Sequence, residues 1–137
     1  MSHLQQAHLL VHAQPPRVRA ALLDPTSLPD WNPAFLTISG STSAAIGERY
    51  PITVRPGISG TFAYTEISDR RIGTAWSAPG FHEDATWELQ PHESGTLVSH
   101  WFEQTGPLAM LLRRAYRGVA ELRLGRLADR VSERPRH

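Results

Sequence analysis

His100 is the residue of this sequence whose surroundings are best suited to chemistry. It lies in one of two segments that alternate apolar and polar residues on either side of a turn at 92–95. A hairpin around that turn pairs Trp87 with His100 and places Phe102 on the same apolar face. A histidine in an apolar pocket can act as a general acid or base with a tuned pKa. The alternative is a core histidine that only hydrogen-bonds a neighbour, and the pattern leaves both open.

A second hairpin carries aromatic residues on both of its faces. A turn at 69–71 pairs Ala63 with Trp76, so Trp76 and Tyr64 fall on opposite faces of the two strands. We expect Trp76 to face the interior, because it shares a face with apolar neighbours. Tyr64 is a second choice that offers a phenolic hydrogen-bond donor. Plain core packing is the alternative for each of these side chains.

The composition excludes several kinds of catalysis. The 137 residues include no cysteine, and all 14 residues counted as Lys or Arg are arginine. A thiol nucleophile, a disulfide and a Schiff-base lysine are therefore excluded. The sequence has neither a G-x-S-x-G serine motif nor a lysine-bearing phosphate loop. His8 and His12 would lie ~13 Å apart along a strand, which is too far to share a metal ion. We expect neither a metal nor a cofactor.

The segment 107–130 is predicted to form one long amphipathic helix. Gly118 and Gly125 flank its apolar stripe, which predicts a close approach to another element. Arg126 continues the stripe, so either the helix has left the sheet there or Arg126 reaches the rim of a cavity. The stripe follows the three- to four-residue spacing of one helix face and consists of Leu108, Leu111, Leu112, Ala115, Val119 and Leu122.

Short strands separated by turns fill the chain before this helix. A strand over 3–13 is followed by two short helices that end near Trp31. One run of strands and one long helix predict an α+β fold in which a sheet wraps around the helix. The length fits a single domain over 1–132 with a frayed tail at 133–137. The six later strands are expected at 35–41, 47–55, 61–68, 72–78, 84–90 and 96–104.

Short motifs along nearly the whole chain match one known pattern. They are Val11 to Val18, Leu22 to Pro25, Leu28 to Pro33, Gly47 to Tyr50, Thr65 to Ile72, and Trp87 to Pro91 followed by Gly95 and Thr96. With these motifs the sequence resembles the SRPBCC superfamily of START and Bet v 1-like proteins, and within it the polyketide cyclase/dehydrase and lipid-transport group. The resemblance implies a helix-grip fold: a seven-stranded antiparallel sheet around the C-terminal helix, with an apolar ligand cavity between them.

The same resemblance suggests where a ligand would lie. Trp31 stands where the short helices of the family close one end of the cavity, so it can gate the entrance, or equally be a wedge between helix and sheet. We expect binding of a small hydrophobic molecule, with acid/base cyclisation or dehydration of a polyketide-like substrate as a narrower possibility. His100 is the candidate catalytic residue, and the candidate ligand-binding residues are Trp31, Tyr64, Trp76, Trp87, Phe102 and Leu112.

The alternative function is a non-catalytic lipid carrier or a co-chaperone-like interaction module. Eight of the fourteen arginines lie in 107–137 against three acidic residues, which we interpret as a solvated helix face, so we expect no nucleic-acid partner. Trp101, expected to face outward beside Leu10, can mark a dimer contact, which leaves a monomer or a homodimer open. Without a signal pattern or an apolar run of spanning length, we expect a cytoplasmic protein with no stable membrane insertion.

Overall fold

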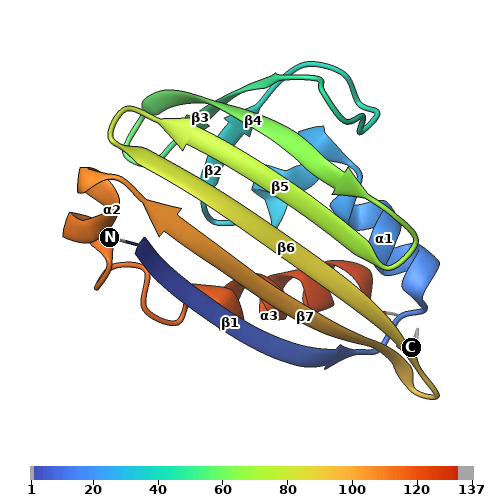
Figure 1. Cartoon of the computed structure of the whole chain (residues 1–137). Coiled ribbons are helices and arrows are strands. Elements are labelled where there is room, and N and C mark those ends of the chain that lie inside the picture. The colour runs from blue at the N-terminus through green and yellow to red at the C-terminus, as the bar shows by residue number, and fades with distance from the viewer. Residues whose placement is uncertain (1, 133–137) are drawn as a thin grey trace.

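The computed structural model describes residues 2–132 and contains one antiparallel sheet of seven strands (Figure 1). The strands are β1 (Ser2–Val11), β2 (Phe35–Ile38), β3 (Tyr50–Val54), β4 (Ile58–Ile67), β5 (Arg71–Ala78), β6 (Phe81–His92) and β7 (Gly95–Thr105). Their order across the sheet is β1-β7-β6-β5-β4-β3-β2. The predicted α+β helix-grip architecture is therefore confirmed, while the proposed tail at 133–137 lies outside the described residues.

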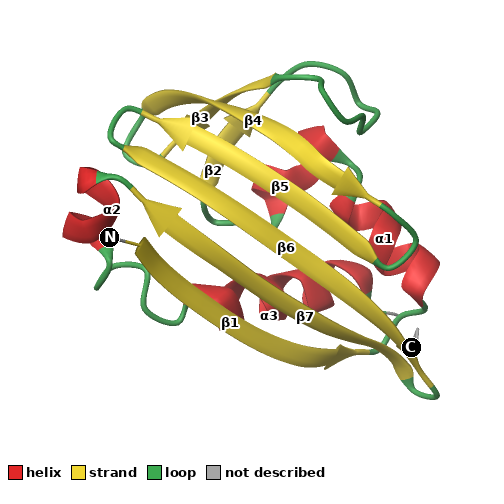
Figure 2. Ribbon diagram, in the orientation of Figure 1, coloured by secondary structure: helices red, strands yellow, loops and turns green. Residues whose placement is uncertain are grey.

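Helices cover one face of this sheet (Figure 2). The helical elements are α1 (Pro15–Leu22), the 3₁₀ helix η1 (Pro25–Asp30), α2 (Pro107–Leu112) and α3 (Val119–Val131). The longest, α3, packs mainly against β1 and β7, while α2 lies at the end of the sheet where β1 begins and β7 ends. In residues 2–132 no helix combines the length and apolar character needed to span a membrane. Apolar and aromatic side chains from both layers fill the space between them.

The β6–β7 hairpin has the predicted register. Trp87 pairs with His100, Ala85 pairs with Phe102, and the strands turn at 92–95. His100 is fully buried, as are the neighbours on its face. The alternation of apolar and polar residues and the length of the turn therefore determine which face of these two strands is internal.

The β4–β5 hairpin has the predicted pairing of Ile67 with Ile72 next to the turn, but farther from the turn it differs from the predicted register by one residue. Tyr64 pairs with Thr74 and Phe62 pairs with Trp76, because the ladder shifts between Tyr64 and Glu66. An extra residue in one strand reverses the faces of everything beyond it. The expectation that Trp76 and Tyr64 point to opposite faces is wrong: both are buried on the inner face.

The predicted continuous helix over 107–130 is also wrong, because the chain forms two helices joined by turns at 113–118. Gly118 precedes α3 with φ +76°, a left-handed conformation that glycine adopts without strain. Two leucines of the predicted stripe are exposed: Leu111 on α2 is 80% exposed, and Leu122, beyond the break, is 44% exposed. The buried face of α3 instead consists of Ala120, Arg123, Leu124, Leu127 and Val131.

The close approach predicted at the two helix glycines is absent. A Cβ built on Gly118 or Gly125 would meet nothing within 4 Å among the described residues. Close packing occurs instead in the sheet, where a Cβ on Gly95 would lie 2.1 Å from the carbonyl oxygen of Val11. Arg126 is exposed, so it does not enter the interior.

Candidate functional site

A buried ion pair between Glu83 and Arg123 lies between the sheet and α3. Two hydrogen bonds join the side chains: Arg123 Nη2 lies 2.9 Å from Glu83 Oε1, and Arg123 Nη1 lies 3.1 Å from Glu83 Oε2. Neither side chain is more than 3% exposed. A charge-assisted pair of this geometry offsets part of the large cost of removing both charges from water.

The carboxylate of Glu83 is also bonded to both neighbouring strands. Trp76 Nε1 on β5 donates to it over 3.1 Å, and Gln104 Nε2 on β7 donates over 2.9 Å. Trp76 and Gln104 are the direct cross-strand partners of Glu83. Three strands and α3 therefore meet at one carboxylate, and the sheet register brings these groups together.

His100 lies next to this pair and is held in one protonation state. Its Nδ1 donates to the carbonyl oxygen of Thr86 over 3.0 Å, which leaves Nε2 to accept from Arg123 Nη1 over 3.4 Å. Its ring stacks on Trp87 with 3.6 Å between centroids. Burial, and then the positive charge of Arg123, lower the pKa of His100 well below its usual value of 6.5. The imidazole is therefore neutral and fixed as the Nδ1–H tautomer.

The space beside the ion pair is an internal cavity of about 10 Å³, which is at the lower limit for one water molecule. Aromatic rings fill most of the interior. For example, Trp31 packs edge-on against Trp87 with 5.4 Å between ring centroids, and the centroids of Phe35 and Trp76 lie 5.9 Å apart. The apolar ligand cavity implied by the resemblance is therefore small in the part of the chain that the structure describes. The residues around the remaining space are Leu22, Leu28, Trp31, Asn32, Phe35, Phe62, Ile72, Thr74, Trp76, Glu83, Ala85, Trp87 and Arg123.

Two buried donors on residues of this lining have no hydrogen-bond partner within residues 2–132. They are Nε1 of Trp31 and Nε of Arg123. A buried N–H without an acceptor costs about 1–3 kcal/mol relative to a satisfied one. The cavity beside these two residues is about as large as one water molecule.

The predicted site residues occupy three different environments. Trp31, Trp76 and Trp87 line the cavity. His100 and Phe102 are buried but do not line it, and the Phe102 ring lies 4.5 Å from the guanidinium carbon of Arg123. The remaining two are elsewhere: the Tyr64 hydroxyl donates to the carbonyl oxygen of Leu22 over 2.6 Å, and Leu112 is half-buried at the end of α2.

The sequence pattern missed Glu83, Gln104 and Arg123. Extending the alternation of β6 back from Ala85 and that of β7 on from Phe102 would have placed Glu83 and Gln104 on the inner face. In the sequence Glu83 stands in a dense run of possible metal ligands at 82–84, whose adjacent side chains are expected to point to opposite faces of the strand. Arg123 had no such signal, because its position depends on where α3 begins.

Trp31 also borders a groove on the outer surface. This groove of about 350 Å³ is lined by Trp31 with Asp30, Arg126, Asp129 and Arg130. An ion pair of 3.5 Å between Asp30 and Arg130 crosses from η1 to α3. Trp31 therefore borders both the groove and the internal cavity.

Removing one partner of the buried pair should destabilise the protein strongly. Glu83→Gln or Arg123→Met alone should each lower the free energy of unfolding by about 3–5 kcal/mol, because each leaves the other charge buried and unpaired. The double variant should lose clearly less than the sum of the two. Urea denaturation of the wild type, the two single variants and the double variant measures this coupling. If the two losses of unfolding free energy were additive, the ion pair would be contradicted.

The buried neutral His100 should make stability depend on pH. Below the unfolded pKa of about 6.5, the unfolded chain binds a proton at His100 that the folded protein does not. The free energy of unfolding should therefore be constant above that pH and fall below it by up to about 1.4 kcal/mol per pH unit. Urea denaturation of the wild type and of His100→Gln from pH 7.5 to 5 gives the free energy of unfolding of each protein. The difference between the two should show this slope. An identical pH dependence in both proteins would contradict it.

Comparisons with known proteins agree with this fold. No curated protein is significantly similar in sequence. Among solved structures, protein CV1439 from Chromobacterium violaceum is 25% identical, with a TM-score of 0.70 over 96% of this chain and 98% of that one. A START superfamily protein from Mycobacterium smegmatis is 17% identical, with a TM-score of 0.73 over 94% and 97% of the two chains. The Zhui aromatase/cyclase from Streptomyces sp. R1128 is 14% identical, with a TM-score of 0.71 over 96% of each.

These structural likenesses establish the START-type fold, and a sequence-family model identifies the group. The model described as polyketide cyclase / dehydrase and lipid transport matches residues 6–132, nearly the whole of the chain. The chain therefore belongs to the polyketide cyclase/dehydrase and lipid transport family.

Proposed function

We propose that this protein binds a small, mainly hydrophobic molecule that carries a carbonyl group, in the interior between the sheet and α3. The observation that carries the proposal is the pair of unpartnered donors, Trp31 Nε1 and Arg123 Nε, in the lining of one cavity. A carbonyl oxygen accepts two hydrogen bonds, so a single ligand atom can satisfy both donors. The aromatic walls supply apolar surface for the rest of the ligand.

Binding requires the interior to open, because the cavity holds no more than about one water. Trp31 is the side chain whose displacement would join the interior to the groove beside Arg126. In the structure its indole contacts Trp87 edge-on, and its N–H has no hydrogen-bond partner within residues 2–132. In this position the side chain therefore lacks one hydrogen bond that it could make. A ligand whose ring replaces the contact with Trp87 and whose carbonyl oxygen accepts from Nε1 would compensate for the displacement.

A matched pair of probes tests the binding proposal. The protein should bind 2-acetylnaphthalene about tenfold more tightly than 2-isopropylnaphthalene, which has the same shape but no carbonyl oxygen, because only the ketone satisfies the buried donors. Trp31→Phe should remove this preference, since it deletes the indole N–H. Trp101→Phe, the same change on the outer face of β7, should retain it. Tryptophan fluorescence titrations measure both affinities, and equal affinity of the wild type for the two probes would contradict the proposal.

The finer proposal is acid/base cyclisation or dehydration of a polyketide-like substrate. In such chemistry the N–H of Arg123 stabilises the enolate oxygen, and the Glu83 carboxylate takes the proton from the carbon next to the carbonyl once one of its four hydrogen-bond donors has moved away. A catalytic role for His100 stays a prediction, because its ring lies behind Trp87 and both of its nitrogens are hydrogen-bonded. Its contact with Arg123 supports a positioning role.

Deuterium exchange tests this chemistry. In D₂O the wild type should accelerate exchange of the acetyl protons of 2-acetylnaphthalene above the rate in buffer, as followed by NMR. A full rate in His100→Gln would remove His100 from the mechanism and leave Glu83 as the base. If the wild type exchanged these protons no faster than buffer does, the proposed enzymatic activity would be contradicted, while the binding proposal would be unaffected.

The second candidate is a non-catalytic carrier or interaction module. The nearly filled interior favours the interaction module, since a cavity of about 10 Å³ offers no preformed site. The interaction module predicts that neither naphthalene probe binds, whereas a carrier binds a probe without accelerating the exchange of its protons. The cytoplasmic location, the absence of a nucleic-acid partner and the choice between monomer and homodimer stay predictions.

A further inference from the structure

The corner between α2 and α3, residues 107–118, presents one apolar side chain directly to solvent. Leu111 is 80% exposed, the highest value among the large exposed hydrophobic residues described. Met110 and Leu112 on either side of it are half-buried, while Ala109 is fully buried and anchors α2 to the core. An exposed leucine at the tip of a short helix contributes nothing to the fold, so it is available to an external partner.

Three arginines surround an open hollow at the same corner. Arg113, Arg114 and Arg117 are exposed and line a hollow of about 500 Å³. Glu121 is the one carboxylate in its lining, and no carboxylate in residues 2–132 forms an ion pair with any of the three arginines. The other lining residues are His3, Gln5, Gln6 and Gly118. The hollow therefore carries a local excess of positive charge.

The corner is held in place by β1. The Gln5 side chain donates to the carbonyl oxygen of Tyr116, and its Oε1 accepts from the N–H of Ala120 over 3.3 Å. The Tyr116 ring stacks on Phe81 with 5.7 Å between centroids, which fixes the turn from the other side. Leu111 and the arginines are thus attached to one braced turn rather than to a free loop.

We propose that this corner docks on the surface of an anionic lipid bilayer. Guanidinium groups bind phosphate with paired hydrogen bonds, so the hollow can take a lipid headgroup. Leu111 then enters the apolar boundary below the headgroups, as the apolar side chains of interfacial helices do. This surface lies outside the interior ligand site and does not depend on the proposed function.

A membrane fits these observations better than a nucleic acid does. Single-stranded nucleic acids stack their bases on aromatic side chains, and Tyr116, the only aromatic residue of the corner, is already stacked on Phe81. An exposed leucine makes no favourable contact with a phosphate backbone, whereas in a bilayer it can enter the apolar region below the headgroups. With one leucine and three arginines the attachment is reversible and sensitive to salt.

Vesicle sedimentation tests the proposal. The wild type should bind vesicles of 70% phosphatidylcholine and 30% phosphatidylglycerol at least tenfold more tightly than pure phosphatidylcholine vesicles. Arg114→Ser with Arg117→Ser should weaken binding roughly 25-fold, since each arginine near an anionic surface is worth about fivefold. Leu111→Ser should weaken it several-fold without changing the preference for anionic lipid.

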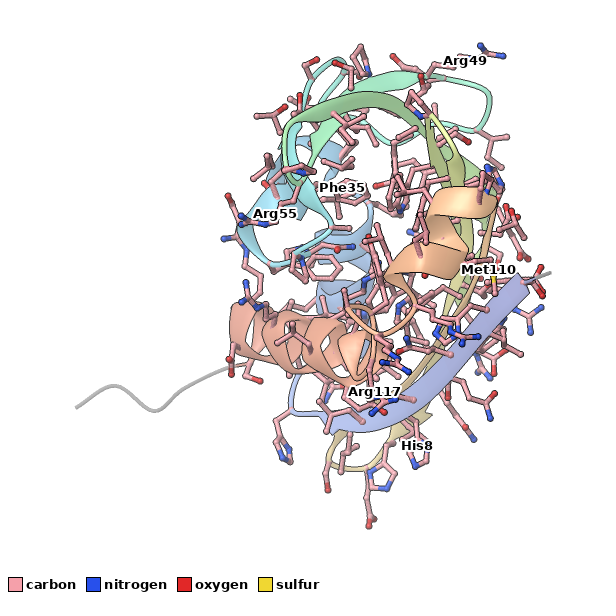
Figure 3. The ribbon with its side chains drawn as sticks, turned by 90° about the vertical axis from the view of Figure 1, so that its left-hand side faces the viewer. His8, Phe35, Arg49, Arg55, Met110 and Arg117 are labelled. Carbon is pink, nitrogen blue, oxygen red and sulfur yellow. The ribbon has the colours of Figure 1, made fainter. Side chains whose placement is uncertain are left out.

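Matched variants in another part of the molecule provide the controls. Arg49→Ser with Arg55→Ser removes the same charge, and Figure 3 shows both residues well away from Arg117. Ile46→Ser removes a side chain that is 60% exposed. Both control proteins should bind like the wild type.

Three results would overturn the proposal. The first is equal binding to the two kinds of vesicle, and the second is an equal loss in the corner and control variants. The third is binding of inorganic phosphate or RNA that depends on Arg114 and Arg117 while vesicles do not bind. Unchanged thermal unfolding of each variant would show that a loss of binding reflects the surface and not the fold.

Discussion

The ion pair between Glu83 and Arg123 is the interaction on which the arrangement of the interior depends. Two charges removed from water are tolerated only when every lobe of the carboxylate is matched by a donor. Here the donors come from α3, β5 and β7, since Arg123, Trp76 and Gln104 all bond to Glu83. A shift of the sheet register or of α3 would leave a charge without a partner, so the pair determines how helix and sheet dock.

The environment of the pair explains why His100 is neutral. The histidine accepts from Arg123 and donates to a backbone carbonyl, so a second proton would place two positive groups together in a buried space. This arrangement keeps Arg123 oriented between Glu83 and Phe102. The same geometry leaves Nε of Arg123 free of a partner beside the cavity, and that free donor gives the interior its capacity to bind an oxygen.

The parts of this structure that the sequence predicted are those with local signals. The register of β6 and β7 follows from the turn at 92–95 and from strict alternation, so the burial of His100 was predictable. The inner face of β4 was not, because the shift after Tyr64 has no mark in the residue pattern. The start of α3 depends on the left-handed conformation of Gly118, and an internal glycine in a helical pattern does not reveal its φ.

The candidate site was only partly predictable for the same reason. Its three tryptophans stood out by type, and the structure places all three in the cavity lining. Its charged residues did not: Glu83 lies among exposed polar neighbours in the sequence, and Arg123 faces inward only because the helix restarts at Gly118. The filled interior reflects long-range packing of aromatic rings, which no local pattern encodes.

On this proposal the free donors of Trp31 and Arg123 receive a carbonyl oxygen. The most direct measurement is the NMR signal of the indole N–H groups in protein labelled with ¹⁵N, recorded as 2-acetylnaphthalene is added. The Trp31 signal should move downfield with the ketone but not with 2-isopropylnaphthalene, while the signal of Trp76, which is already bonded to Glu83, should change little. A Trp31 signal that responds equally to both compounds, or to neither, would contradict it.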